Sequence, residues 1–338
     1  MQSFGLFQAF VMILISGVLN GSAAAPLKYA RRSEWENLWL VQTVLAMLLI
    51  PWVLVWATIS HPMTVFRNSS VPALAAAAGF GFGWGVGTLL YIIGVVMVGM
   101  SVSFAIILSL TATLGSLLPL IVQHPQELRS CQGHLLIASL VITIVGIGLC
   151  AMAGAVRAHA ESSSAPQQAV RHFWQGIVVC VLSGVFSPML NFAFAFGEPI
   201  TAAAKKLGAS PVWAANGLWA IALSAAFGLN AIYCLQRLGF SRSWSRFRDA
   251  PWENLIAGSM MGLLFFVSVI MYGIGAGRLG NWGTSAGWAI YMCATVFTAN
   301  LWGLATGEWR NAPKKSYVYL GAGLLAITVA IILASPAS

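Results

Sequence analysis

The residues that could do chemistry in this 338-residue sequence are mostly uncharged. Amides, hydroxyls, tryptophans and tyrosines occur inside long apolar stretches, whereas the 8 acidic and 17 basic residues fall between those stretches or near their ends. Amides and hydroxyls can hydrogen-bond sugar hydroxyls, and aromatic rings can stack on the C–H face of a sugar ring. The pattern therefore predicts a cavity for a neutral, polyhydroxylated solute.

Seven residues inside the apolar stretches are our candidates for substrate binding. An amide or hydroxyl in hydrocarbon is costly unless it is paired, so such residues usually face the protein interior. The candidates are Asn20, Trp84, Tyr91, Ser187, Asn191, Tyr272 and Trp288. The alternative interpretation is that these side chains only join helices by hydrogen bonds. Pro188, in the middle of an apolar stretch, is expected to free backbone groups near the cavity.

Three acidic residues lie close to the apolar stretches: Glu36, Glu198 and Glu308. For Glu36 and Glu308 we expect ion pairs at the membrane surface. Glu198 has no basic neighbour in the sequence until Lys205, so it is our candidate for a proton-coupling residue.

An enzyme is not indicated. The segment 283–287 matches the GxSxG pattern of hydrolases, but a serine nucleophile needs a base within hydrogen-bond reach, and all five histidines lie in loops or at helix ends. The glycine-rich segment 79–87 lacks the lysine of a phosphate-binding loop, and its spacing favours close helix packing instead. The five cysteines show no CxxC spacing. We therefore expect no catalytic residue, metal or cofactor.

The composition determines which elements position these residues. Hydrophobic residues make up 59% of the chain and charged residues 7%, and the mean hydropathy is +0.84. A soluble domain carries roughly a quarter charged residues, so this chain is expected in a membrane. A membrane-spanning helix needs about 20 apolar residues. Ten such runs occur, at 4–26, 36–59, 71–97, 100–122, 133–155, 174–196, 211–236, 253–276, 284–306 and 317–334. The predicted fold is an all-α membrane protein with ten transmembrane helices.

The basic residues predict the topology. Loops after odd-numbered helices hold 12 Lys and Arg, and loops after even-numbered helices hold 5. Positive charge favours the cytoplasmic side, which predicts periplasmic N- and C-termini for a protein of the bacterial inner membrane. Residues 1–27 contain no basic residue, so the first helix is expected to remain uncleaved. The net charge of +9 forms no stripe for nucleic acid, and lipid head groups are the expected polar neighbours.

A polar segment divides the chain into two five-helix halves. We predict a first repeat at 1–156, a cytoplasmic linker at 157–173 and a second repeat at 174–338. With five crossings each, the halves enter the membrane from opposite faces, as inverted repeats of transporters do. Short echoes support the repeat: Ser16-Gly17-Val18 recurs as Ser183-Gly184-Val185, and Tyr91 with Gly94 recurs 181 positions later as Tyr272 with Gly275.

Motifs in a shared order carry a family resemblance across nearly the whole chain. They include Ala25-Pro26-Leu27-Lys28, Trp35-Glu36-Asn37-Leu38-Trp39, Pro51-Trp52, Trp84-Gly85-Val86-Gly87, Gly99-Met100-Ser101, Phe186-Ser187, Leu207-Gly208, Arg237-Leu238, Tyr272-Gly273, Trp288 and Glu308-Trp309-Arg310-Asn311-Ala312. The chain thereby resembles the L-rhamnose–proton symporter family of the drug/metabolite transporter superfamily. The resemblance implies ten helices, an inverted repeat and proton-driven uptake of a 6-deoxy sugar by alternating access.

Two positions depart from the family pattern. The enterobacterial pattern has an acidic residue before the tryptophan of the ninth helix, whereas 281–287 contains none, and Glu198 stands where that pattern has a lysine. A facilitator without proton coupling is therefore one alternative. The others are a drug/metabolite-type carrier or exporter of another small neutral metabolite, and a membrane sugar receptor. We expect a monomer.

Overall fold

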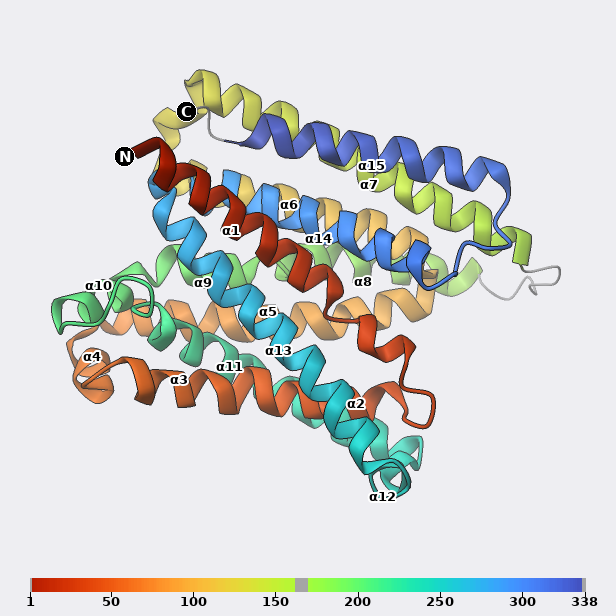
Figure 1. Cartoon of the computed structure of the whole chain (residues 1–338), viewed down its shortest axis with the longest axis horizontal. Helices are drawn as coiled ribbons and strands as arrows, with labels where there is room; N and C mark the ends of the chain where they lie inside the picture. Colours follow the sequence, from red (N-terminus) through yellow and green to blue (C-terminus); the bar gives the residue numbers. More distant parts are fainter. Residues whose placement is uncertain (1, 162–169, 336–338) are drawn as a thin grey trace. The chain divides into compact units, whose positions relative to one another are not determined.

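The computed structural model describes residues 2–161 and 170–335, and within these ranges the regular structure is entirely helical (Figure 1). The first half of the chain contains α1 (Gln2–Ser22), η1 (Ala25–Lys28), α2 (Trp35–Thr43), η2 (Val44–Leu49), α3 (Ile50–Thr58), α4 (Pro62–Asn68), α5 (Val71–Val98), α6 (Met100–Gln123), η3 (Pro125–Arg129) and α7 (Cys131–Glu161). The second half contains α8 (Val170–Phe186), α9 (Met189–Phe196), α10 (Glu198–Lys206), α11 (Asn216–Phe240), η5 (Ser243–Ser245), α12 (Arg246–Asp249), α13 (Pro251–Arg278), η6 (Gly280–Trp282), α14 (Ala286–Ala305) and α15 (Lys314–Ala334).

The predicted number of membrane spans is confirmed in the described residues. Ten helical segments are long and apolar enough to cross a membrane. They are Gly5–Lys28, Trp35–Thr58, Val71–Val98, Met100–Gln123, Cys131–Ala160, Phe173–Lys206, Asn216–Phe240, Pro251–Arg278, Ala286–Ala305 and Lys314–Ala334. The second span runs through α2, the π-helical η2 and α3, and the sixth through α8, α9 and α10.

The chain forms two compact units that do not follow its two sequence halves. Unit 1 comprises Met1–Gly21, Gly87–Pro188 and Gly275–Ser338, and unit 2 comprises Ser22–Val86 and Met189–Ile274. Each unit therefore takes helices from both predicted repeats. The boundaries at 1–156 and 174–338 stay a prediction, because a repeat is a relation of sequence and topology, whereas these units are defined by packing.

In unit 1, α7 and α15 lie side by side and run in opposite directions (Figure 1). Gly146 of α7 faces Ile327 of α15, and Gly323 of α15 faces Cys150 of α7. A Cβ atom on Gly323 would lie 2.6 Å from the Cys150 sulfur, so the glycines allow the two helices to approach closely. This pair closes one side of the core that also contains residues of α14.

In unit 2, α11 packs against α2, η2 and α3, and against the glycine-rich part of α5. A Cβ atom on Gly81 would collide with the backbone of Ala222, and one on Gly85 would lie 2.9 Å from the Cα of Ala226. Gly81 and Gly85 are one helical turn apart, as are their two partners. The interpretation of segment 79–87 as a close-packing face is confirmed for these glycines.

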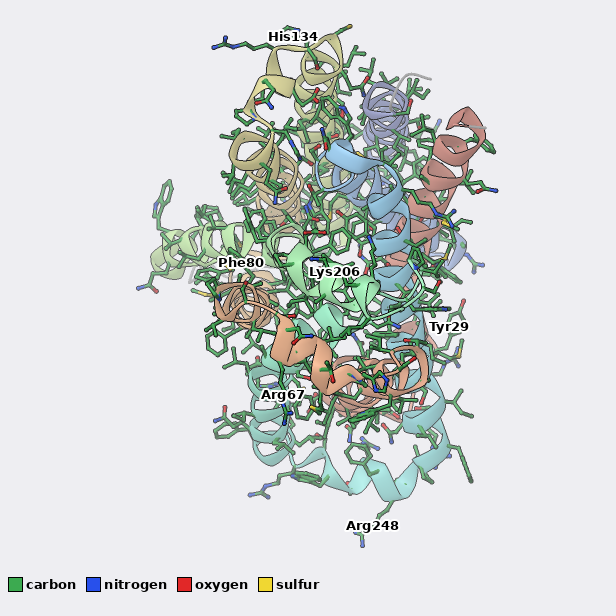
Figure 2. The ribbon with its side chains drawn as sticks, turned by 90° about the vertical axis from the view of Figure 1, so that its left-hand side faces the viewer. Tyr29, Arg67, Phe80, His134, Lys206 and Arg248 are labelled. Carbon is green, nitrogen blue, oxygen red and sulfur yellow. The ribbon has the colours of Figure 1, made fainter. Side chains whose placement is uncertain are left out.

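The two ends of unit 2 carry different loops. At one end, Arg32 donates its backbone N–H to Glu253 over 2.7 Å, and Arg246 pairs with Glu34 at 3.8 Å, so the loops after the first and seventh spans lie together. At the other end, α4 packs against α10, and Figure 2 shows Arg67 and Lys206 there. This grouping is the one that the odd and even loops of the predicted topology require.

Contacts inside unit 1 recur at equivalent positions of the two halves. Gly94 of α5 faces Cys180 of α8, and Gly275 of α13 faces Ile13 of α1. Gly275 follows Gly94 by 181 positions, and Cys180 follows Ile13 by 167, the offset that also relates Gly17 to Gly184. An inverted repeat would produce such paired contacts. The repeat itself stays a prediction.

Candidate functional site

Three of the seven predicted binding residues belong to unit 2: Trp84, Asn191 and Tyr272. The hydroxyl of Tyr272 on α13 donates a hydrogen bond of 2.5 Å to Oδ1 of Asn191 on α9, and both side chains are buried. Trp84 on α5 stacks on Phe265 of α13, with ring centroids 5.5 Å apart and planes 5° from parallel. Phe265 follows Trp84 by the same 181 positions that relate Tyr91 to Tyr272.

Aromatic rings lie next to the Asn191–Tyr272 pair. Phe194 lies 5.9 Å from the Tyr272 ring and stacks on Trp219 of α11 at 5.2 Å. Trp219 is 1% exposed, and Gly273, next to Tyr272, lies against its indole. Unit 2 therefore holds an amide and a hydroxyl within a wall of rings, the combination that binds sugars. Sequence reasoning missed Phe194 and Trp219, because apolar spans of this chain contain many aromatic residues.

The other four predicted residues belong to unit 1: Asn20, Tyr91, Ser187 and Trp288. Trp288 of α14 is buried and donates its indole N–H to the carbonyl of Thr111 on α6 over 3.0 Å. Asn20 of α1 donates its amide to the hydroxyl of Thr295 on α14 over 3.4 Å.

Two further unit 1 residues lie on α5 and beside it. Tyr91 stacks on Phe104 of α6 at 5.7 Å. Ser187 lies in the break between α8 and α9, where its backbone N–H donates to Ser183 over 2.8 Å and Gly87 of α5 lies against it. Pro188 lies in the same break, since α8 ends at Phe186 and α9 begins at Met189.

The structure brings Asn191 and Tyr272 together directly. The contacts described above for the other five predicted residues lie within one unit or the other, and the seven divide between the two units. Asn20 and Trp288 each donate a hydrogen bond to a neighbouring helix, which agrees with either interpretation. Convergence of all seven on one cavity stays a prediction.

The acidic residues behave differently from one another. Glu308 pairs with Arg157 at 3.4 Å near the exposed ends of α7 and α14, as predicted. The expectation of a surface ion pair for Glu36 is wrong: the Glu36 side chain is buried and accepts a hydrogen bond from Ser243. Glu198 is exposed at the first position of α10. Spacing could not reveal the burial of Glu36, because η5, which covers it, comes 207 residues later.

The GxSxG segment does not form a nucleophile site. The Ser285 side chain is fully buried, and its hydroxyl donates to the backbone carbonyl of Trp282 over 3.3 Å. Among the described residues, no three His, Cys, Asp or Glu side chains come close enough to hold a metal ion. The arrangement offers uncharged hydrogen-bonding groups and rings, which suit the recognition of a neutral solute.

Ten apolar helices with polar and aromatic groups buried among them define a polytopic membrane protein. The model of the L-rhamnose-proton symport protein (RhaT) family matches residues 5–336, so the chain belongs to that family, whose members are symporters and not enzymes.

Individual relatives agree with the family match. The chain is 23% identical to an L-rhamnose-proton symporter of Salmonella typhi and 24% identical to one of Shigella dysenteriae serotype 1. It is 23% identical to an L-rhamnose-proton symporter of Escherichia coli O9:H4. Each similarity extends over 314 residues and covers 90% of both chains.

Proposed function

We propose that this protein is a secondary active transporter that imports L-rhamnose or a related 6-deoxyhexose together with protons. The observation that carries the proposal is the family match over residues 5–336, in a chain whose ten spans agree with a multi-pass carrier. Alternating access is the expected mechanism. Sugar and proton would bind from one side of the membrane and leave on the other.

The proposed sugar-binding residues are the seven predicted from the sequence. In unit 2, the buried Asn191–Tyr272 hydrogen bond and the rings of Phe194 and Trp219 support the role of Asn191 and Tyr272. In unit 1, the carbonyl bonded to Trp288 and the hydroxyl bonded to Asn20 are groups that a sugar could engage after a helix shift. We assign Trp84 and Tyr91 the role of stacking surfaces, and Ser187 that of a hydrogen-bonding group at a helix break.

Glu198 is the sequence-based proposal for proton coupling. Its carboxyl is exposed, at the end of unit 2 where α10 packs against α4. A carboxyl there can exchange protons with water directly. Replacing Glu198 by Gln should reduce the response of uptake to a proton gradient, and an unchanged response would remove this residue from the mechanism.

The proposed setting is the bacterial inner membrane, with both termini periplasmic. The loops after the first and seventh spans hold many of the basic residues, and they meet at one end of unit 2. This placement supports a cytoplasmic assignment of that end. We propose a monomer built from two inverted repeats, which the paired glycine contacts of unit 1 support.

Uptake by purified protein in liposomes tests the proposed function. Labelled L-rhamnose should enter in exchange for internal unlabelled L-rhamnose, and an inward proton gradient should concentrate the sugar. Exchange without concentration would favour a facilitator. Saturable binding without any flux would favour a sugar receptor, and no binding or flux would refute the proposal.

A further inference from the structure

Glu36 is unusual among the acidic residues of this chain. Of the seven acidic residues whose side chains the structure describes, Glu36 alone is buried, with 2% of its surface exposed. It lies in the first turn of α2, directly after the exposed segment that contains Arg31 and Arg32. A carboxylate withdrawn from water costs free energy unless positive charge or several donors compensate for it.

A serine hydroxyl is the donor that the structure gives to Glu36. Ser243 in η5 donates its hydroxyl to Oε1 of Glu36 over 2.9 Å. The neighbouring Asn37 donates its amide to the backbone carbonyl of Ser243 over 3.1 Å. Glu36 and Asn37 of α2 thus bind the side chain and the backbone of Ser243. Protonation of Glu36 would therefore change one of the two hydrogen bonds that attach η5 to α2.

Two arginines from distant segments contact Trp35 and Glu34, which are close to Glu36 in the sequence. On α11, the Arg237 guanidinium lies over the ring of Trp35 at 6.0 Å, and its Nε is buried without a hydrogen-bond partner among the described residues. Arg246 of α12 pairs with Glu34.

Glu253, an acidic residue in the first turn of α13, has hydrogen-bond partners of its own. Glu253 accepts hydrogen bonds from the backbone N–H of Arg32 over 2.7 Å and from the hydroxyl of Ser33 over 2.8 Å. In the described part of the chain, no Lys, Arg or His forms an ion pair with Glu36.

We infer that the Glu36 carboxyl is a second protonation site of the transport cycle, in addition to the exposed Glu198 proposed above. The carboxylate takes up one proton to become a neutral acid, and it returns that proton to water at the end of unit 2 that carries the basic loops. Burial without an ion pair makes the neutral form compatible with apolar packing, whereas the charged form depends on the Ser243 hydroxyl. This inference rests on the proposed proton–rhamnose symport.

A path from Glu36 to the polar groups of the span follows the same face of α2. Trp39, one helical turn after Glu36, donates its indole N–H to Oδ1 of Asn230 on α11 over 3.4 Å. Asn230 is buried and donates in turn to the carbonyl of Ala226, which packs against Gly85. A change in how α2 meets η5 and α11 therefore acts on the helix that also carries Trp219.

The test replaces Glu36 by Gln, which keeps an oxygen that can accept from Ser243 but cannot be protonated at these pH values. If one proton moves with each sugar, an inward gradient of one pH unit concentrates L-rhamnose up to about tenfold in liposomes with the wild-type protein. With Glu36→Gln, accumulation should fall to about the external concentration, while exchange of internal for external L-rhamnose continues. Glu36→Asp, which can still be protonated, should restore part of the accumulation.

The matched control is Glu34→Gln, two residues away on the exposed side, which should accumulate L-rhamnose as the wild type does. Wild-type accumulation by Glu36→Gln would overturn the inference while leaving the proposed symport intact. Loss of both exchange and accumulation in Glu36→Gln and Glu36→Asp alike would also overturn it, because the residue would then serve structure alone. No exchange by the wild-type protein would refute the proposed function itself.

Discussion

Replacing Tyr272 by Phe should weaken L-rhamnose binding by an amount that the structure allows us to estimate. The change removes only the hydroxyl that donates to Asn191 over 2.5 Å, and it leaves the ring that packs beside Phe194. Removing one partner of a buried hydrogen bond costs about 1–3 kcal/mol. If the Tyr272 hydroxyl also hydrogen-bonds the bound sugar, the loss of that second hydrogen bond, at the same cost, corresponds to an increase of about 5- to 150-fold in Kd.

The assay is equilibrium binding of labelled L-rhamnose to purified protein, with thermal unfolding measured in parallel. The matched control is Trp52→Phe, which removes an indole N–H that donates to Ser224 over 2.8 Å, also within unit 2. Both variants should lower the unfolding temperature. Only Tyr272→Phe should raise Kd, because neither Trp52 nor Ser224 is among the proposed binding residues.

The single variants Tyr272→Phe and Asn191→Ala and their double variant form a double-mutant cycle for sugar binding. If the two residues act as a unit, the second change should add little to the first, with a coupling free energy of about 1–3 kcal/mol. A Kd within about twofold of the wild type in Tyr272→Phe, at a lowered unfolding temperature, would refute the binding role. The Tyr272–Asn191 hydrogen bond would then serve only to hold α13 and α9 together.

Three further predictions concern packing, charge and topology. Gly81→Ala should destabilise the protein by about 1–3 kcal/mol, because the added Cβ collides with the backbone of Ala222. Gly79→Ala should leave the stability unchanged, because no atom lies within 4 Å of the added Cβ. Equal unfolding temperatures of the Gly81→Ala and Gly79→Ala variants would show that close packing at Gly81 does not matter. Arg157→Ala should cost about 1–2 kcal/mol in thermal unfolding, because it removes the 3.4 Å ion pair with Glu308 and the contact of the guanidinium with the Trp309 ring at 4.8 Å, and an unchanged unfolding temperature would contradict this. Cys131, the exposed first residue of α7, should react with an impermeant thiol reagent from outside the cell, in a variant without the other cysteines, and labelling only after lysis would invert the topology.

Hydropathy and proline were sufficient to predict most of the fold. The ten spans follow from the length of apolar runs, and the break near Pro188 follows from the missing backbone donor of proline. The short helices α4 and α12 could not be predicted, because seven and four residues are too few for a periodic signal. The division into two packing units depends on contacts between distant segments, which a single sequence does not encode locally.

The candidate site was predicted in residue type but only partly in grouping. Composition identified Asn191 and Tyr272 as polar groups in apolar spans, and the structure places them in hydrogen-bond contact. From the sequence we expected Glu36 to form an ion pair at the membrane surface, because it lies at the end of an apolar stretch and follows Arg31 and Arg32. Its burial arises from η5, a distant segment that folds over the start of α2. Residue type is thus local information, whereas the environment of a side chain depends on tertiary packing.

In the proposed mechanism sugar and proton cross the membrane together, and simultaneous recording of both tests this coupling most directly. Liposomes that contain the wild-type protein and an internal pH-sensitive dye should acidify when L-rhamnose is added outside, with no gradient imposed beforehand. Acidification should grow with the amount of labelled sugar that enters. Sugar entry with a constant internal pH would contradict the account.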